Sequence, residues 1–276
     1  MSVDTQQSTR CGALKRSDAG DVGLRTFRHG GIEDAHIICL PFGGGSSHIF
    51  AGVAGQLPTS WTVSAVEYPG HLHGWGEVID HIDPLCEALI RGLGVSILES
   101  SWIMGHSLGG LISLRLTHLL ERYGRRPKGC IACAVKPPSR IDSSPHLSNL
   151  SRKDMLSRWL DMLGQDRSTN NDALFDLIEP ILRADMRVYE SCAGLDMALT
   201  HTPLLVLSSE GDEIVPLQYD HEWGQVAPHV QTDRVEGGHL FVLSNPSRLA
   251  DRLVRFVQDL HAAGGNITVD YSNGHP

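Results

Sequence analysis

The sequence predicts an α/β protein with a mostly parallel central sheet, helices on both faces and one helical insertion that forms a lid. Three observations predict this architecture. Short continuous apolar runs alternate with helical patterns up to about residue 135, which is typical of parallel strands buried on both faces. Only helical patterns occur from about residue 150 to residue 200. Two more strand patterns and an amphipathic helix then complete the sheet.

Composition bounds the class of protein. The chain has 276 residues, of which 41% are hydrophobic, and its net charge is -9. This length favours one domain, and the charge argues against a nucleic-acid binder. No apolar run reaches membrane-spanning length, and no secretory signal is recognised. We expect a disordered leader over 1–20, one domain over 21–262 with its lid at about 140–200, and a flexible tail over 263–276.

Cysteine usage indicates a reducing, cytoplasmic location. The six cysteines are scattered along the chain, and the pair Cys130 and Cys133 lies within a predicted strand. Side chains three residues apart on a strand point to opposite faces, so this pair is predicted to be two buried thiols rather than a redox centre. We therefore expect no disulfides.

The elements are expected in a definite order, with their bounds read from apolar periodicity and turn residues. The first strand is expected at the sheet edge. The expected strands cover 24–28, 35–40, 61–66, 102–104, 129–135, 203–208 and 229–235. The expected helices cover 48–57, 82–98, 108–123, 174–178, 181–195 and 246–261, with a further helical stripe from 155 to 163.

The chain is organised around the sequence GHSLG at residues 105–109, which joins an apolar strand to a helical pattern. A serine in such a strand-turn-helix is held on a strained, sharp turn with its hydroxyl exposed. Gly105 and Gly109 remove the side chains that would collide across the turn. Ser107 is therefore the predicted nucleophile.

A glycine-rich loop, PFGGGSS at residues 41–47, follows the strand over 35–40. It lacks the Gly-Lys-Ser/Thr of a phosphate-binding loop. If its strand lies beside the serine strand, the loop is placed to stabilise a developing oxyanion. The expected backbone donors are the N–H groups of Gly43 and Leu108.

Two further groups complete a catalytic constellation. His239 follows a strand and two glycines, which distinguishes it from the other histidines, and it is the predicted general base and acid. Asp212 follows the strand over 203–208 and is predicted to orient the imidazole, although Glu210 and Glu213 are adjacent alternatives. The order Ser, Asp, His along the chain is the one expected for this type of sheet.

No metal or cofactor is predicted. His71 and His73 are two residues apart, but no carboxylate or thiol is suitably spaced to complete a metal site, so we expect them to form a polar rim. The helical insertion would cover the nucleophile, shape the acyl pocket and exclude water.

Over residues 35–260 the sequence resembles the stand-alone type II thioesterases of nonribosomal peptide and polyketide synthase pathways. The resemblance rests on LPFGGGS at 40–46, EYPG at 67–70, GHSLGG at 105–110, IEPILRAD at 178–185 and GGH at 237–239. It departs from the family at residues 42–43, at 108–110 and at His71, where the family commonly has Arg.

The resemblance implies an α/β-hydrolase fold and a serine hydrolase acting on thioester bonds. The implied reaction releases acyl, aminoacyl or peptidyl groups from the phosphopantetheine arm of carrier proteins, through Ser107, Asp212 and His239. The implied partners are carrier protein domains, with no nucleic acid or membrane. A carboxylester hydrolase for small diffusible esters remains the main alternative. A binding module on a hydrolase fold and a cyclising thioesterase are weaker ones, and the acyl preference stays open.

Overall fold

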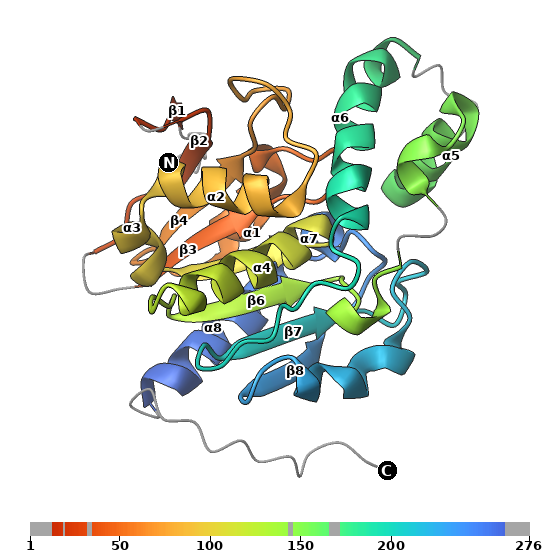
Figure 1. Ribbon diagram of the computed structural model, residues 1–276. Helices are drawn as coiled ribbons and strands as arrows, with labels where there is room; N and C mark the ends of the chain where they lie inside the picture. Colours follow the sequence, from red (N-terminus) through yellow and green to blue (C-terminus); the bar gives the residue numbers. More distant parts are fainter. Residues whose placement is uncertain (1–12, 19, 32–34, 143–145, 166–171, 263–276) are drawn as a thin grey trace, which may run out of the picture.

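The computed structural model describes residues 13–18, 20–31, 35–142, 146–165 and 172–262. A single eight-stranded sheet crosses the molecule in the order β1-β2-β4-β3-β5-β6-β7-β8 (Figure 1). The first two strands run antiparallel to their neighbours, and all the remaining neighbours pair in parallel. The strands are β1 Leu14–Arg16, β2 Gly23–Arg28, β3 His36–Leu40, β4 Thr62–Glu67, β5 Trp102–His106, β6 Gly129–Cys133, β7 Leu204–Ser208 and β8 Val230–Arg234.

Helices cover both faces of the sheet. Side chains of α2 and α4 pack with one face, and those of α1, α7 and α8 pack with the other. The α-helices are α1 Ala51–Gln56, α2 Ile82–Leu93, α3 Val95–Glu99, α4 Leu108–Arg122, α5 Arg152–Leu163, α6 Asp172–Glu190, α7 Phe241–Ser244 and α8 Pro246–Ala262. Short 3-10 helices lie at η1 Ser47–Phe50, η2 Pro138–Arg140, η3 Leu147–Asn149 and η4 Leu217–Gln225. The predicted fold class is confirmed.

Alternate residues of each strand enter opposite cores, as the period of a strand requires. Cys130 belongs to the core on the α4 face, whereas Cys133 belongs to the core on the α8 face. Both thiols are free and fully buried. Burial raises the pKa of Cys130 to about 11, an effect that its hydrogen bonds to Ser113 and Thr117 oppose. The two thiols therefore do not form a redox pair.

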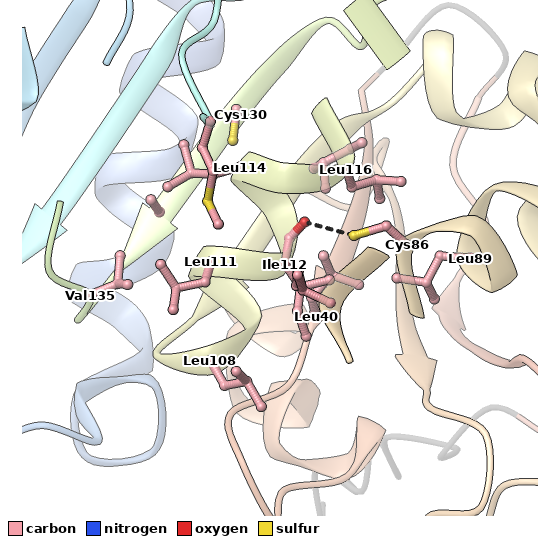
Figure 2. Packing of buried hydrophobic residues seen from close by; sticks show 14 of the residues in the cluster. Leu40, Cys86, Leu89, Leu108, Leu111, Ile112, Leu114, Leu116, Cys130 and Val135 are labelled. Atoms are coloured by element: carbon pink, nitrogen blue, oxygen red, sulfur yellow. Dashed lines mark hydrogen bonds between the residues drawn. The ribbon is translucent and has the colours of Figure 1, made fainter. Parts of the chain in front are cut away.

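Helix α4 is the centre of the core on its face (Figure 2). Twelve of its residues are buried, including the polar Ser113 and Thr117. Figure 2 shows Leu108 and Leu111 on the turns that lead away from the serine loop, with Val135 beside them and Cys86 of α2 on the other flank. The helix that begins after Ser107 is thus fixed on several sides, and this fixes the serine loop in turn.

The N-terminal edge differs from the expectation. Leu14–Arg16 form β1 and pair with β2, so β2 is the second strand and not the edge strand. The sequence LKR carries two charges and no apolar alternation, which is common at a sheet edge and gave no strand signal. Residues 1–12 of the expected leader and 263–276 of the expected tail lie outside the described residues.

Two helices also differ from their expected bounds. The helix expected over 82–98 is divided at Gly94, whose φ of 82° separates α2 from α3. The two helices expected over 174–178 and 181–195 form one helix, α6, with Pro180 inside it. Proline normally ends or kinks a helix, but here buried apolar residues lie on both sides of Pro180 and the helix continues to Glu190.

Helices α5 and α6 form the lid and have a small core of their own. In Figure 1 they stand side by side beyond one end of the sheet, with α6 leading back toward it. Their shared core consists of Met155, Trp159, Leu160, Phe175, Ile178 and Leu182. In the part of the chain that is described, no helix is long and apolar enough to cross a membrane.

Candidate active site

Ser107 lies on a sharp turn between β5 and α4. Its φ of 55° and ψ of -116° are strained for a residue with a side chain. A 2.7 Å hydrogen bond from the Ser107 N–H to the Cys133 carbonyl oxygen fixes the turn to the end of the neighbouring strand β6. Packing is so close that a Cβ at position 105 would lie 1.8 Å from the Gly109 carbonyl oxygen. The structure thus agrees with the expected strand-turn-helix.

Replacing Gly109 with alanine is expected to lower the free energy of unfolding by about 3 kcal/mol. The added Cβ would lie 2.1 Å from the Leu40 carbonyl oxygen and 2.6 Å from that of Pro41, and backbone cannot move as a side chain end can. Urea unfolding measures the change. Gly55→Ala is the matched control, because a Cβ there meets open space in α1 and should raise stability slightly. Equal stability of the Gly109 variant and wild type would contradict this packing.

The three side chains predicted to act together do meet. His239 Nε2 lies 2.9 Å from Ser107 Oγ, and His239 Nδ1 lies 2.8 Å from Asp212 Oδ2. Because the Asp212 carboxylate accepts a hydrogen bond from the Nδ1–H, the neutral ring carries its proton on Nδ1 and leaves Nε2 free to accept the Ser107 hydroxyl proton. This is the arrangement that activates a serine.

Asp212 is held as a charged carboxylate. Its Oδ1 accepts hydrogen bonds from the N–H groups of Ile214 at 2.8 Å and Val215 at 2.9 Å. Burial acts to raise the pKa of Asp212, but the hydrogen bond to His239, the charge of that ring and the two backbone N–H groups outweigh burial and lower it. The two alternative carboxylates, Glu210 and Glu213, lie elsewhere. Glu210 is exposed and pairs with Arg234, while Glu213 lines the pocket.

His106, next to the serine, connects the two loops. It is fully buried, and its Nε2 donates a 2.7 Å hydrogen bond to the His239 carbonyl oxygen. Burial, together with the nearby His239 ring, lowers the pKa of His106 to about 3, so the ring is neutral at physiological pH. The turn that carries Ser107 is therefore bonded to the loop that carries His239 by a contact separate from the reacting side chains.

The glycine-rich loop lies beside the serine turn, as expected. Leu40 at the end of β3 pairs with Gly105 at the end of β5, so both loops leave the sheet at the same edge. This is also the point where the strand order reverses, because β4 follows β3 on one side and β5 pairs with it on the other. Ligands of such sheets bind at this switch point. Gly43 and Leu108 both line the pocket that contains Ser107.

The pocket over Ser107 has a volume of about 500 Å³, and both lid helices contribute side chains to its wall. This volume lies within the range typical of small-molecule sites. Charged groups at its wall are Lys136, Arg140, Asp142, Arg158 and Glu213. The apolar lid side chains that line it are Met155, Trp159, Met162, Leu182 and Met186.

Two residues at the site were missed by sequence reasoning. His106 lies within the serine motif but was read only as part of the turn. Asp185 lies in the family-like segment IEPILRAD, yet its role depends on a hydrogen bond to Gly44, 141 residues away. A charged residue at a core position of an amphipathic helix was the available signal.

His71 and His73 do not lie together. The His71 ring is buried and contacts Asp185, whereas the exposed His73 packs edge-on against the His48 ring. Within the described residues, no group of three or more His, Cys, Asp or Glu side chains could hold a metal ion.

Comparisons with known proteins agree with this geometry. The thioesterase domain model matches residues 35–260. Thioesterase PikA5 of Streptomyces venezuelae is 27% identical over 209 residues, which is 72% of each chain. YbtT, a type II thioesterase from the yersiniabactin biosynthetic pathway, is 26% identical with a TM-score of 0.73, covering 84% of this chain and 96% of YbtT.

The type II thioesterase BorB from the borrelidin cluster has the same fold, with a TM-score of 0.76 at 23% identity over 87% of this chain and 98% of BorB. The resemblance noted from the motifs is therefore confirmed. The protein belongs to the thioesterase domain family and is a hydrolase of thioester bonds with an α/β-hydrolase fold.

Proposed function

We propose that this thioesterase releases acyl, aminoacyl or peptidyl groups from the phosphopantetheine arm of carrier proteins in a nonribosomal peptide or polyketide pathway. One observation carries the proposal. Ser107, His239 and Asp212 are joined by hydrogen bonds, and Ser107 and His239 line a pocket of about 500 Å³ to which the lid contributes apolar side chains. The pathways named for similar thioesterases support the same substrate class.

The reaction follows from the hydrogen bonds. His239 Nε2 accepts the hydroxyl proton as Ser107 Oγ attacks the thioester carbonyl carbon. The N–H groups of Gly43 and Leu108 stabilise the oxyanion; the Leu108 N–H is one of the unpaired donors in the first turn of α4. The C–S bond then breaks, and His239 gives its proton to the leaving thiolate.

Deacylation repeats the sequence with water. His239 Nε2 takes a proton from a water molecule, whose oxygen attacks the acyl-serine carbonyl. Collapse of the second tetrahedral intermediate releases the carboxylic acid, and the proton returns to Ser107 Oγ. Asp212 keeps the ring in one tautomer and stabilises the imidazolium that forms in each half. No cofactor of the enzyme enters either half.

The sequence offers one candidate docking patch for a carrier protein, the basic residues Arg122, Arg125, Arg126 and Lys128, although their pattern favours a solvated surface. In the structure this patch is poorly placed for the proposed chemistry. Helix α4 begins next to Ser107 and ends at Arg122, so the patch lies at the opposite end, roughly 20 Å along the axis. Arg125 also pairs with Glu99. Docking near the lid fits the proposed reaction better.

Hydrolysis of a panel of acyl-loaded carrier proteins tests the proposal. We expect turnover of carrier-bound thioesters at a higher kcat/KM than turnover of matched p-nitrophenyl esters, because the lid and the carrier both contribute binding energy. Liquid chromatography with mass detection follows the loss of the acyl group. A strong preference for the small oxygen esters would favour the carboxylester hydrolase instead.

A further inference from the structure

One buried carboxylate joins the lid helix to the glycine-rich loop. Asp185 of α6 is 1% exposed, and its Oδ2 accepts a 2.7 Å hydrogen bond from the Gly44 N–H. The same oxygen lies 3.2 Å from His71 Nε2. Oδ1 is buried without a hydrogen-bond partner among the described residues. Gly44 and His71 are therefore the hydrogen-bond partners of this carboxylate among the described residues.

The geometry favours a protonated His71. Its Nε2 faces the Asp185 carboxylate, and its Nδ1 lies 3.3 Å from the Pro69 carbonyl oxygen. A neutral imidazole has one N–H donor, whereas the imidazolium has two, so only the charged ring satisfies both acceptors. Burial opposes the charge, but Asp185, the Pro69 carbonyl and Glu67 outweigh it, and the pKa of His71 is raised above its usual value.

The other groups that face His71 are also consistent with a cation. The Tyr68 ring packs edge-on against it at 5.2 Å between centroids, and burial holds the pKa of that phenol well above its usual range, so Tyr68 is neutral. Glu67 of β4 accepts hydrogen bonds from the N–H and hydroxyl of Ser47 at 3.0 and 2.7 Å. Its charge lies close enough to favour the imidazolium.

The loop rests directly on the lid helix. A Cβ at Gly43 would lie 3.3 Å from Met186 Cε and 3.6 Å from Asp185 Cβ. Gly44 has a φ of 73°, which fixes the bend of the loop at this point. The N–H that Asp185 holds belongs to the peptide unit following Gly43, so a shift of α6 would also shift the Gly43 backbone.

We propose that Asp185 and His71 are positioning residues for the reaction. Asp185 ties the lid helix to the glycine-rich loop through the Gly44 N–H, and His71 holds the Asp185 carboxylate in place, so that the Gly43 N–H meets the oxyanion. The inference rests on the proposed function in that Gly43 is the oxyanion donor. It adds a pH dependence: the tie is complete while His71 is protonated and weakens as the pH rises through the raised pKa of His71.

Steady-state kinetics over about pH 6 to pH 9 tests the proposal with a p-nitrophenyl ester and an acyl-pantetheine thioester. Three variants are compared with wild type: Asp185→Asn, His71→Gln and His71→Arg. His73→Gln is the matched control, since His73 is exposed two residues away. Circular dichroism and thermal melting establish that each variant is folded.

Asp185→Asn is expected to lower kcat about 100-fold with little change in KM, the loss typical of a misplaced catalytic group. Wild-type kcat should fall on the alkaline side. His71→Gln should show a lower kcat at acidic pH and lack this alkaline fall, whereas His71→Arg should keep the high kcat across the range. His73→Gln should match wild type throughout.

A purely structural role would lower the melting temperature and leave the shape of the pH profile unchanged. Wild-type kcat in both Asp185→Asn and His71→Gln, or an alkaline fall that persists in His71→Arg, would overturn the inference. Failure of the proposed function gives a different result, because wild type would then prefer the oxygen ester. The kcat values of the variants would still be compared on that ester, since its hydrolysis passes through the same oxyanion. If wild type hydrolyses neither substrate, the inference fails with the function.

Discussion

Ser107→Ala is expected to lower kcat about a million-fold. The variant retains the pocket, the Gly43 loop and His239, but it has no oxygen to attack the thioester. Whatever rate remains comes from binding and oxyanion stabilisation acting on water. Hydrolysis of acyl-loaded carrier protein, followed by mass detection of the carrier, measures the loss.

Ser96→Ala provides the control for this prediction, because Ser96 is exposed in α3, remote from the pocket. It should retain wild-type kcat. A fluorophosphonate probe should label wild type and Ser96→Ala but not Ser107→Ala. Turnover by the Ser107 variant within tenfold of wild type would show that another group is the nucleophile.

Asp212→Asn is expected to lower kcat about 10⁴-fold. The asparagine oxygen can keep the hydrogen bonds from Ile214 and Val215, which leaves its amide nitrogen facing His239 Nδ1. An N–H donor at this place favours the tautomer protonated at Nε2. That tautomer cannot accept the Ser107 proton, so the geometry survives while the base is lost.

The neighbouring acids decide whether this effect is specific to Asp212. Glu210→Gln should retain wild-type kcat, because Glu210 is exposed and its partner Arg234 lies on the surface. Glu213→Gln changes only the wall of the pocket, so KM is expected to change more than kcat. A larger loss of kcat in either glutamate variant than in Asp212→Asn would reassign the orienting carboxylate.

Much of this fold could be predicted from the sequence, because its central strands are buried on both faces and therefore appear as continuous apolar runs. The run from Ala35 to Leu40 could be placed without any knowledge of its neighbours. The edge strand Leu14–Arg16 could not, because it is stabilised by pairing with β2 and has little apolar burial of its own. Local sequence patterns also misplaced two helix boundaries. Gly94 divides a helix that the apolar periodicity predicted to be continuous, whereas Pro180 does not interrupt α6, which was predicted as two helices.

The meeting of Ser107, Asp212 and His239 was predictable for a topological reason. Each of these residues follows a strand, and the carboxyl ends of parallel strands lie at the same edge of the sheet. Asp185 and His71 follow no such rule. Their contact joins the lid to a loop 114 residues away in sequence, and only the three-dimensional packing reveals that the aspartate is buried against a histidine and a backbone N–H.

The contact from His106 to the His239 carbonyl has a practical consequence. This hydrogen bond does not involve Ser107 Oγ. In Ser107→Ala, the loop that carries His239 should therefore keep its position, and the pocket should keep its shape. Ser107→Ala should then bind the acyl-loaded carrier protein without hydrolysing it, long enough for the complex to be isolated. Mass spectrometry of the acyl group on the bound carrier protein would identify the natural substrate directly, so that no library of candidate substrates has to be chosen in advance.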